Sequence, residues 1–352
     1  MSTIDPNAAA RPDSGLFGLD TPAEQAGVIL LPVPFDATTS YHRGAALGPT
    51  AILQASRQVE LYDHETGHPY RAGIHLLPPP DGIDLWNEEA RAAAEPILAR
   101  GGEIGEDAAL RARLARVNEL GERVAEVVER TAEHWLDAGR LFGVVGGDHS
   151  VPLGAICACA RRHPGLGILH IDAHADLRRA YQGFVHSHAS IMANVLERAP
   201  QLGRLVQVAV RDLCPEELER IQHSNGRVVL FHDAELWRAR HSGEPFVRIC
   251  ERIVAELPAE VYISFDIDGL DPALCPHTGT PVPGGLGFAE ACALLSALSG
   301  SGRRVVGFDL CEVAPGPDPH DEWDGNVGAR ILYKLIGHAL RSRFSPSGAS
   351  SC

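Results

Sequence analysis

Short apolar segments that do not alternate with polar residues recur along the chain, and longer segments with apolar residues at helical spacing separate them. Non-alternating apolar segments are typical of strands that are buried on both faces of a sheet. The segments that predict strands are Gly27–Leu31, Gly73–Leu77, Leu141–Val145, Gly167–Ile171, Leu205–Val210, Val228–Phe231, Val261–Phe265 and Val305–Leu310. The segments that predict helices are Pro49–Ser56, Ala108–Ala138, Val151–Arg161, Ser190–Arg198, Glu216–Gln222, Phe246–Glu256, Phe288–Leu298 and Asn326–Ser342. This alternation predicts an α/β fold with one mostly parallel sheet and helices on both of its faces.

The pattern covers residues 21–343 without a break that would separate two domains, so we expect a single domain there. Residues 1–20 are polar and contain two prolines, which favours a flexible N-terminal tail. Residues 78–107 contain a proline triplet, an alanine-rich segment and two adjacent glycines, and we expect them to form a surface insertion. The serine-rich residues 344–352 are expected to be disordered.

Composition narrows the class of protein. The chain is 45% hydrophobic and 22% charged, which is ordinary for a soluble globular protein. Its formal net charge is −15 and no segment is rich in Lys and Arg, so we do not expect a nucleic-acid partner. No apolar segment approaches the ~20 residues that a membrane span requires, and we find no secretory signal, so we expect a cytoplasmic protein without a membrane partner.

The chain has eight cysteines, and in a cytoplasmic protein these are expected to be reduced thiols. Cys157 and Cys159 form a C-x-C pair within a predicted helix. A zinc site requires more ligands at set spacings, so we interpret this pair as buried packing.

Chemistry-bearing residues follow two of the predicted strands, at the edge of the sheet where ligands bind in open α/β folds. His149 comes after the predicted strand Leu141–Val145, behind two glycines that allow a sharp turn. Asp172, His174 and Asp176 follow the next strand, and their i, i+2, i+4 spacing in an extended chain places them on one side. Carboxylates combined with imidazole suit Mn²⁺, Fe²⁺, Co²⁺, Ni²⁺ or Zn²⁺ better than Ca²⁺.

A second pair of acids, Asp266 and Asp268, follows the predicted strand Val261–Phe265, again on one side of the chain. Two buried strand ends that each carry paired aspartates would cost many kcal/mol without cations between them. The residues of both motifs therefore predict about two divalent ions, and such a pair of ions can share one water molecule and lower its pKa.

Further along the chain, Glu312 follows the last predicted strand, at the same edge of the sheet. A carboxylate there can bind a planar guanidinium through two parallel hydrogen bonds, although an exposed strand-end glutamate is the alternative. His186 and His188 lie in the loop after Asp176, where either could relay a proton or be an ordinary loop histidine.

The motifs resemble, in order, the signature of the arginase–agmatinase (ureohydrolase) superfamily, and the chain resembles an agmatinase-like member from about Ala26 to His338. The motifs that carry the resemblance are Gly-Gly-Asp-His-Ser (146–150), Asp-Ala-His-Ala-Asp (172–176), Ser-Phe-Asp-Ile-Asp-Gly-Leu-Asp-Pro (264–272), Arg43-Gly44 with Gly48-Pro49, and Thr278-Gly279-Thr280-Pro281. The resemblance implies a three-layer α/β/α sandwich on a mainly parallel eight-stranded sheet, and a homo-oligomer, as a trimer or hexamer.

The resemblance also implies roles for individual residues, and two Mn²⁺ ions as cofactors, with Ni²⁺ or Co²⁺ as alternatives. The expected ligands of one ion are His149, Asp172, Asp176 and Asp266. Those of the other are Asp172, His174, Asp266 and Asp268, so that Asp172 and Asp266 bridge. The residues expected to act on the substrate are Asp268 and His188 in proton transfer, Glu312 in binding the guanidinium, and Asp212 and Thr280 beside it. The chain departs from the family pattern at Ala189, where relatives often have Gly, and at Ala314, where Asn is common.

The implied reaction is metal-dependent hydrolysis of a C–N bond in a linear amidine, which releases urea and an amine from a guanidino compound. Two alternatives stay open at this point. The first is hydrolysis of formiminoglutamate with release of formamide, and the second is a non-catalytic binding or regulatory relative.

Arg178 bears on the substrate, because it lies two residues after Asp176 and begins the loop that leads to His188. We expect it at the mouth of the site. A guanidinium there repels an ammonium tail and can hold a carboxylate by a bidentate pair. This favours a guanidino or formimino acid, such as 4-guanidinobutyrate or formiminoglutamate, whereas the resemblance alone favours agmatine.

We predict that arginine is a poor substrate. Arginases have a second Asp at the position that corresponds to Cys214 of this chain, just before a proline. That Asp helps to hold the α-amino group of the substrate. A neutral thiol cannot supply a charge-assisted hydrogen bond worth about 1.5–3 kcal/mol, or about tenfold to a hundredfold in affinity. Urea release measured across arginine concentrations tests this, and efficient turnover at micromolar KM would contradict it.

Overall fold

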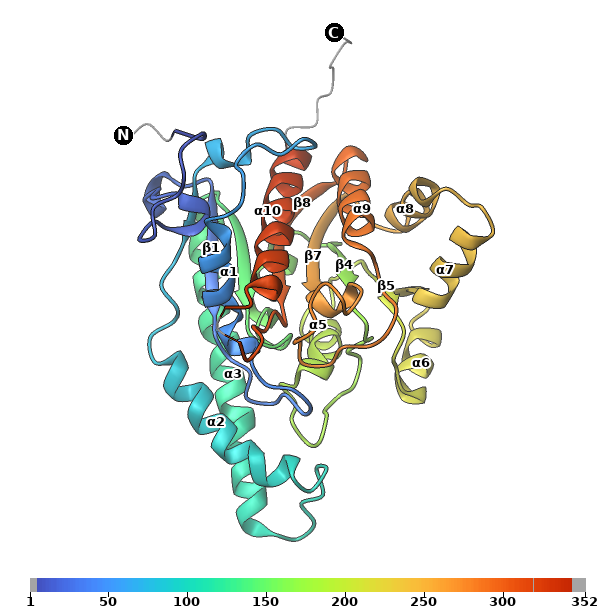
Figure 1. Cartoon of the computed structure of the whole chain (residues 1–352). Helices are drawn as coiled ribbons and strands as arrows, with labels where there is room; N and C mark the ends of the chain where they lie inside the picture. The colour runs from blue at the N-terminus through green and yellow to red at the C-terminus, as the bar shows by residue number, and fades with distance from the viewer. Residues whose placement is uncertain (1–4, 319, 344–352) are drawn as a thin grey trace.

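One sheet of eight parallel strands forms the centre of the computed structural model, which describes residues 5–318 and 320–343 (Figure 1). Across the sheet the strands follow the order β2-β1-β3-β8-β7-β4-β5-β6. Their bounds are β1 Val28–Val33, β2 Ile74–Leu76, β3 Leu141–Gly146, β4 Gly167–Ile171, β5 Arg204–Val210, β6 Val228–His232, β7 Glu260–Asp266 and β8 Arg304–Cys311. Every segment predicted as a strand is therefore a strand, and the three-layer parallel fold is confirmed.

Helices cover both faces of this sheet, as Figure 1 shows. One layer contains α1 (Gly48–Ser56), α8 (Phe246–Ala255), α9 (Phe288–Gly300) and α10 (Trp323–Arg343), which contact one another in the order α1, α10, α9, α8. The other layer contains α3 (Ala108–Asp137), α4 (Leu153–Arg162) and α5 (Ile191–Arg198), with α4 between its neighbours. The short α6 (Pro215–Gln222) connects β5 to β6.

Burial on both faces of the sheet explains why the apolar pattern of the sequence predicts the positions of the strands. Every residue of β3 and of β4 is buried, because helices lie on both faces and leave no polar face to alternate with an apolar one. Helix α3 begins where Asp107 accepts hydrogen bonds from the main-chain N–H groups of Ala109 and Leu110. Some of its buried apolar residues cluster with those of α4, and others cluster with residues 93–97.

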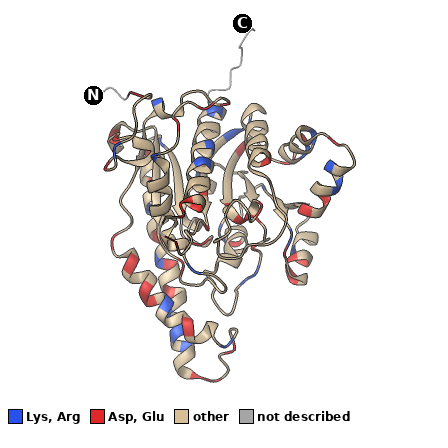
Figure 2. Cartoon of the chain, viewed as in Figure 1, with Lys and Arg blue, Asp and Glu red and all other residues tan. Residues whose placement is uncertain are grey.

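Two helices were missed by the sequence analysis. Helix α2 (Ile83–Leu98) lies within the expected surface insertion, and it packs along α3 at the lower left of Figure 1. Its alanine-rich sequence and internal Pro96 concealed the helical spacing. Acidic and basic residues are interspersed along these two helices (Figure 2), and Arg116 of α3 forms a bidentate ion pair with Glu89 of α2. Helix α7 (Asp233–His241) buries only Leu236, which left no apolar period to detect.

The N-terminal segment is more ordered than expected. Leu16 and Phe17 are both 2% exposed and belong to the main hydrophobic core. The main-chain N–H of Phe17 donates to Ser56 Oγ at 2.9 Å, and its ring lies 4.7 Å from that of Tyr333. The expectation of a flexible tail over residues 1–20 is therefore wrong for the part near residue 17. The expected disorder of 344–352 lies outside the described residues.

The described part of the chain contains the helices α1 to α10 and seven of the eight cysteines. In this part of the chain, no helix is both long and apolar enough to cross a membrane. The seven cysteines described are free thiols, and Cys157 and Cys159 are buried in α4, as expected for packing.

We predict that Lys334, the only lysine of the chain, stabilises the fold through a partly buried ion-pair cluster. Its Nζ lies 2.7 Å from Asp63 Oδ2 and 2.8 Å from Glu65 Oε2. Burial alone would raise the pKa of Asp63, but hydrogen bonds from Lys334 and Thr66 outweigh burial and lower it. Lys334→Met should reduce the free energy of unfolding at pH 7 by about 1–3 kcal/mol.

Because the folded-state pKa of Asp63 is depressed, this contribution is present above its ordinary value of 3.8 and is lost as the pH falls below it. Denaturant unfolding at pH 7 and at pH 3 measures both effects. As a control, Arg248→Met removes an exposed pair with Glu251 and should cost less than about 0.5 kcal/mol. Equal effects of the two substitutions would contradict the prediction.

Candidate metal centre and substrate pocket

The candidate site lies where five neighbouring strands of the sheet end. In the order β3-β8-β7-β4-β5, each strand is followed by one or more of the residues singled out from the sequence. Their side chains converge because parallel strands have their carboxyl ends at the same edge of the sheet. Ile171 of β4 pairs with Phe265 of β7, so the aspartates that follow these two residues lie side by side.

His149 is held at the centre of this edge by a tight turn. A Cβ on Gly147 would collide with the carbonyl oxygen of Phe35, so only glycine fits there. The main-chain N–H of His149 donates to Glu312 Oε1 at 2.9 Å, and the side chain is 1% exposed.

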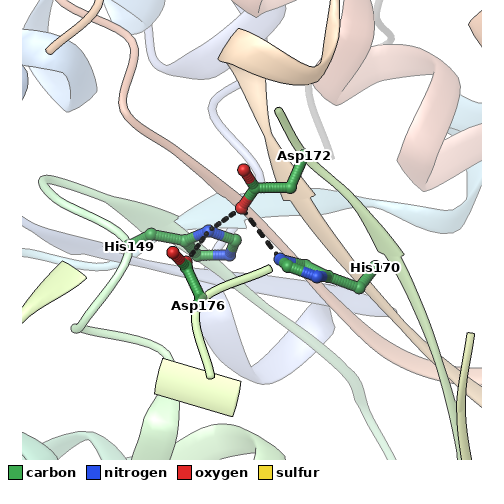
Figure 3. A group of neighbouring side chains, drawn as sticks. All are labelled: His149, His170, Asp172 and Asp176. Atoms are coloured by element: carbon green, nitrogen blue, oxygen red, sulfur yellow. Dashed lines mark hydrogen bonds and ion pairs between the residues drawn. The ribbon is translucent and has the colours of Figure 1, made fainter. Parts of the chain in front are cut away.

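The first group of side chains surrounds His149 Nδ1, and Figure 3 shows His149 with two of them, Asp172 and Asp176. This nitrogen lies 3.0 Å from Asp172 Oδ2, 3.1 Å from Asp266 Oδ2 and 3.5 Å from Asp176 Oδ2. All four side chains are buried. One imidazole and three carboxylates that converge in this way are a donor set for a divalent transition-metal ion.

The second group surrounds His174 Nδ1, which lies 3.1 Å from Asp268 Oδ2 and 3.4 Å from Asp172 Oδ1. Asp172 thus offers one carboxylate oxygen to each group. Two donor sets that share an acid are the arrangement expected for two neighbouring ions, and the described residues His149, Asp172, His174, Asp176, Asp266 and Asp268 all take part.

The buried carboxylates of the cluster repel one another, and this repulsion shifts their pKa values. Burial and the charge of Asp172 raise the pKa of Asp176 well above its usual range. Burial and the charges of Asp268 and Asp172 do the same to the pKa of Asp266. For His149 burial opposes protonation, but hydrogen bonds with Asp172 and Asp266 outweigh it and raise the pKa. Bound divalent ions would relieve this repulsion, so the residues present fit a metal centre.

The structure also brings in residues that the sequence analysis did not select. His170 belongs to the first group, with Nε2 2.9 Å from Asp172 Oδ2. On the other side of His149, Nε2 lies 2.9 Å from Ser264 Oγ, which donates to Asp309 Oδ1 at 3.1 Å. The signal for His170 was present in the sequence, because it lies two residues before Asp172 in an extended strand and so faces the same side.

A cavity of about 270 Å³ opens above the metal-binding candidates. Its lining contains the expected substrate residues Arg178, His188, Asp212 and Thr280, together with His174, Asp176, Tyr41, Tyr181 and Glu217. Thr280 Oγ1 donates to Asp268 Oδ2 at 3.3 Å, which ties the pocket wall to the metal cluster.

The two loop histidines separate into different surroundings. His188 lines the cavity, and its Nδ1 has no hydrogen-bond partner among the described residues. Burial, followed by the neighbouring His174, lowers the pKa of His188 to about 4, so its ring is neutral near pH 7. His186 turns away, and its Nε2 lies 3.0 Å from Glu122 Oε2 on α3.

Arg178 lines the cavity, as its position in the sequence led us to expect, but it is not free. Its Nε lies 3.8 Å from Glu217 Oε2, and its guanidinium is 4.9 Å from the ring centre of Tyr181. Glu217 in turn accepts hydrogen bonds from the main-chain N–H groups of Leu177 and Cys214. The charge of Arg178 is therefore partly balanced by a buried acid.

Glu312 is not among the residues that line this cavity; it is buried next to His149 and has an uncommon backbone conformation. Its φ is 63°, in the left-handed region, and Asp176 with φ 54° is also there. Non-glycine residues adopt such angles mostly where the surroundings hold them, and these positions cluster at functional sites. Burial and the charge of Asp266 raise the pKa of Glu312 well above its usual range. Its Oε2 is buried and has no hydrogen-bond partner among the described residues.

Comparison with known proteins identifies the class. Residues 26–337 match the Arginase family. The N(1)-aminopropylagmatine ureohydrolase of Thermus thermophilus is 35% identical over 320 residues, covering 90% of this chain and 92% of that protein. The enzyme of the same name from Synechocystis is 33% identical and covers 89% of both chains. The agmatine ureohydrolase of Thermoplasma volcanium superimposes with a TM-score of 0.70 and 25% identity, covering 92% of this chain and 93% of that chain.

The chain therefore belongs to the arginase family, whose enzymes depend on a dinuclear metal centre. It is a hydrolase that acts on the C–N bond of a guanidino compound and forms urea and an amine, as its motifs predicted.

We predict that Asp266→Asn abolishes binding of at least one metal ion. The substitution removes a charge from the first donor set while it preserves the size of the side chain. Metal content measured by mass spectrometry should fall, and urea formation should fall on the order of a hundredfold or more, because outer-shell substitutions alone cost about 10–100-fold. Asp271→Asn, an exposed acid five residues later, serves as the control and should retain both. Full metal content and activity in Asp266→Asn would contradict the dinuclear centre.

Proposed function

We propose that this protein hydrolyses an agmatine-type guanidino amine, N(1)-aminopropylagmatine or agmatine, at a centre of two Mn²⁺ ions. The relatives at 33–35% identity that span about nine-tenths of the chain are named for the first of these compounds. An agmatinase of Bacillus anthracis is 28% identical over 317 residues. The proposed location is cytoplasmic and the proposed assembly is a homo-oligomer, and both stay predictions.

The residues that would hold the ions are those of the two donor sets. His149, Asp172, Asp176 and Asp266 would bind one ion, and Asp172, His174, Asp266 and Asp268 would bind the other. Oxygen-rich sets with a single imidazole favour Mn²⁺ over softer ions, with Ni²⁺ or Co²⁺ as alternatives. When bound, such ions lower the pKa of water and supply a nucleophile near neutral pH.

The observation that carries the proposal is the buried Oε2 of Glu312, which has no hydrogen-bond partner within residues 5–318 and 320–343. A buried acceptor without a donor is costly, and a guanidinium is the planar cationic donor that satisfies it. Glu312 Oε1 is fixed by the N–H of His149, so the carboxylate is already oriented. We assign Glu312 the role of holding the guanidino group against the metal centre.

The remaining roles concern proton transfer and orientation. Asp268, oriented by Thr280, lies where it can pass a proton to the leaving amine. His188 lines the cavity with a neutral ring, and its Nδ1 has no partner in the described part of the chain, so it can accept a proton and relay it toward solvent. These roles agree with the expectations from the sequence and remain proposals.

The charges along the cavity favour a cationic tail. Beyond the metal-binding candidates, the lining has two acids, Asp212 and Glu217, and one base, Arg178. The negative charge of Glu217 partly neutralises the positive charge of Arg178. Asp212 is therefore the acid of the lining that can bind the ammonium group of a substrate. This revises the expectation that Arg178 selects a carboxylate. Formiminoglutamate hydrolysis and a purely binding role have no comparable support.

The test is a substrate panel assayed for urea with Mn²⁺-loaded enzyme. We expect the highest kcat/KM for N(1)-aminopropylagmatine or agmatine, and lower values for 4-guanidinobutyrate. Asp212→Asn should lower kcat/KM for the cationic substrates by about tenfold, the value of one charged hydrogen bond, with little effect on 4-guanidinobutyrate.

Two further variants make the panel decisive. Glu312→Gln should lower kcat/KM for every guanidino substrate on the order of a hundredfold while metal content is unchanged. Arg178→Ala should affect all substrates similarly. If 4-guanidinobutyrate is preferred and Arg178→Ala selectively removes that preference, then Arg178 is a carboxylate clamp and the proposed substrate class is wrong.

A further inference from the structure

His170 lies in the metal cluster and is not one of the six expected ligands. It is located in β4 with 0% exposure, and its Nε2 is 2.9 Å from Asp172 Oδ2 (Figure 3). By distance alone it could bind an ion together with His149, Asp172 and Asp176. Whether it is a ligand or a hydrogen-bond donor depends on which ring nitrogen carries the proton.

Gln207 of β5 decides that question. Its Nε2 lies 2.7 Å from the carbonyl oxygen of Ala175 and 2.9 Å from His170 Nδ1. A carbonyl oxygen can only accept, so the amide nitrogen of Gln207 must face it, and the opposite orientation would place two acceptors against each other. An amide nitrogen has two protons to donate and no lone pair to offer. His170 Nδ1 therefore accepts the second of these protons.

The consequence for His170 follows directly. A ring whose Nδ1 accepts a hydrogen bond is neutral and carries its proton on Nε2. That Nε2–H points at Asp172 Oδ2 and has no lone pair for a metal ion. A protonated imidazolium is excluded by the same contact, because Gln207 would then face a donor with a donor.

His149 provides the opposite case within the same cluster. Ser264 Oγ donates to Asp309 Oδ1, so its lone pairs accept from His149 Nε2–H at 2.9 Å. With Nε2–H directed at Ser264, Nδ1 of His149 faces the three carboxylates, where its lone pair would bind an ion. Without an ion, a proton on Nδ1 is donated to Asp172 and Asp266. With an ion bound, the two histidines therefore use the same tautomer for different purposes, one toward an ion and one toward an acid.

The geometry points to His170 and Gln207 as a pair of positioning residues that orient Asp172, the acid shared by the two donor sets. Asp172 Oδ2 faces the first set, while Oδ1 accepts from the main-chain N–H of His174 at 2.6 Å and faces the second. The ring of His170 donates to one oxygen and the main-chain N–H of His174 donates to the other, so these two hydrogen bonds fix the carboxylate plane before an ion arrives. This inference rests on the proposed dinuclear centre and adds the pair that holds its shared ligand.

The first test reads the tautomer without any substitution. In ¹⁵N-histidine NMR spectra of the full chain, metal-free and loaded with diamagnetic Zn²⁺, His170 should show the pattern of a neutral ring protonated at Nε2 in both states. The signal is assigned by its disappearance in His170→Gln. A ring protonated at Nδ1, or a change of Nε2 to a metal-bound signal on loading, would overturn the inference.

The second test measures metal affinity by titration with Mn²⁺. His170→Met removes the donor and should weaken binding by about 10–100-fold, as is usual for groups that hold a ligand. His170→Gln places an amide N–H near the former Nε2 and should stay within about threefold of the native affinity. Gln207→Met removes the donor that keeps His170 protonated on Nε2, and its Mn²⁺ affinity should lie between those of the two His170 variants. Thermal unfolding of the metal-free forms checks that each variant is folded.

Native affinity in a folded His170→Met would refute the positioning role. Equal weakening in folded His170→Gln and His170→Met would refute the donor role and favour direct ligation. If the native chain binds no Mn²⁺, the metal-centre proposal itself fails, and the tautomer in the metal-free spectrum still decides the relation between His170 and Asp172.

Discussion

Mutual repulsion among four buried aspartates at one edge of the sheet is the constraint on which the rest of this structure depends. Asp172, Asp176, Asp266 and Asp268 are each at most 4% exposed, and among the described residues the imidazoles that face them are those of His149, His170 and His174. Such a cluster cannot be stable as four free carboxylates in an apolar surrounding. Bound cations, protonation of the carboxylates, or both must reduce this repulsion. Enzymes of the arginase family depend on a dinuclear metal centre, which provides the cations.

The order of the strands in the sheet brings the residues of this cluster together. The strands β3, β8, β7, β4 and β5 are adjacent, so their following loops form one continuous edge although they come from distant parts of the sequence. Around the acids, neutral polar side chains contact three members of the cluster. Ser264 lies behind His149, Gln207 behind His170, and Thr280 beside Asp268. Each satisfies a polar atom and leaves the carboxylate oxygens directed inward.

The pocket combines residues that can bind metal ions with residues that can contact the tail of a substrate. Its lining includes the metal-binding candidates His174 and Asp176, and the buried Glu312, in a left-handed backbone conformation, lies next to His149. The wall contains Arg178 against Glu217, with Asp212 nearby. Chemistry shared by the family is thus placed on strand ends, which are rigid, while selectivity for the tail depends on loop residues, which vary more freely.

The sequence by itself determined the eight strands and the six cluster residues, for a physical reason. Strands buried on both faces must be apolar throughout, and paired acids after such strands require a cation. It did not determine helices such as α7, whose few buried residues leave no period, or the packing of Leu16 and Phe17. Only the tertiary structure decided that Arg178 lies against Glu217 and that Gln207 orients His170, because both contacts join segments whose proximity depends on how the strands are arranged in the sheet.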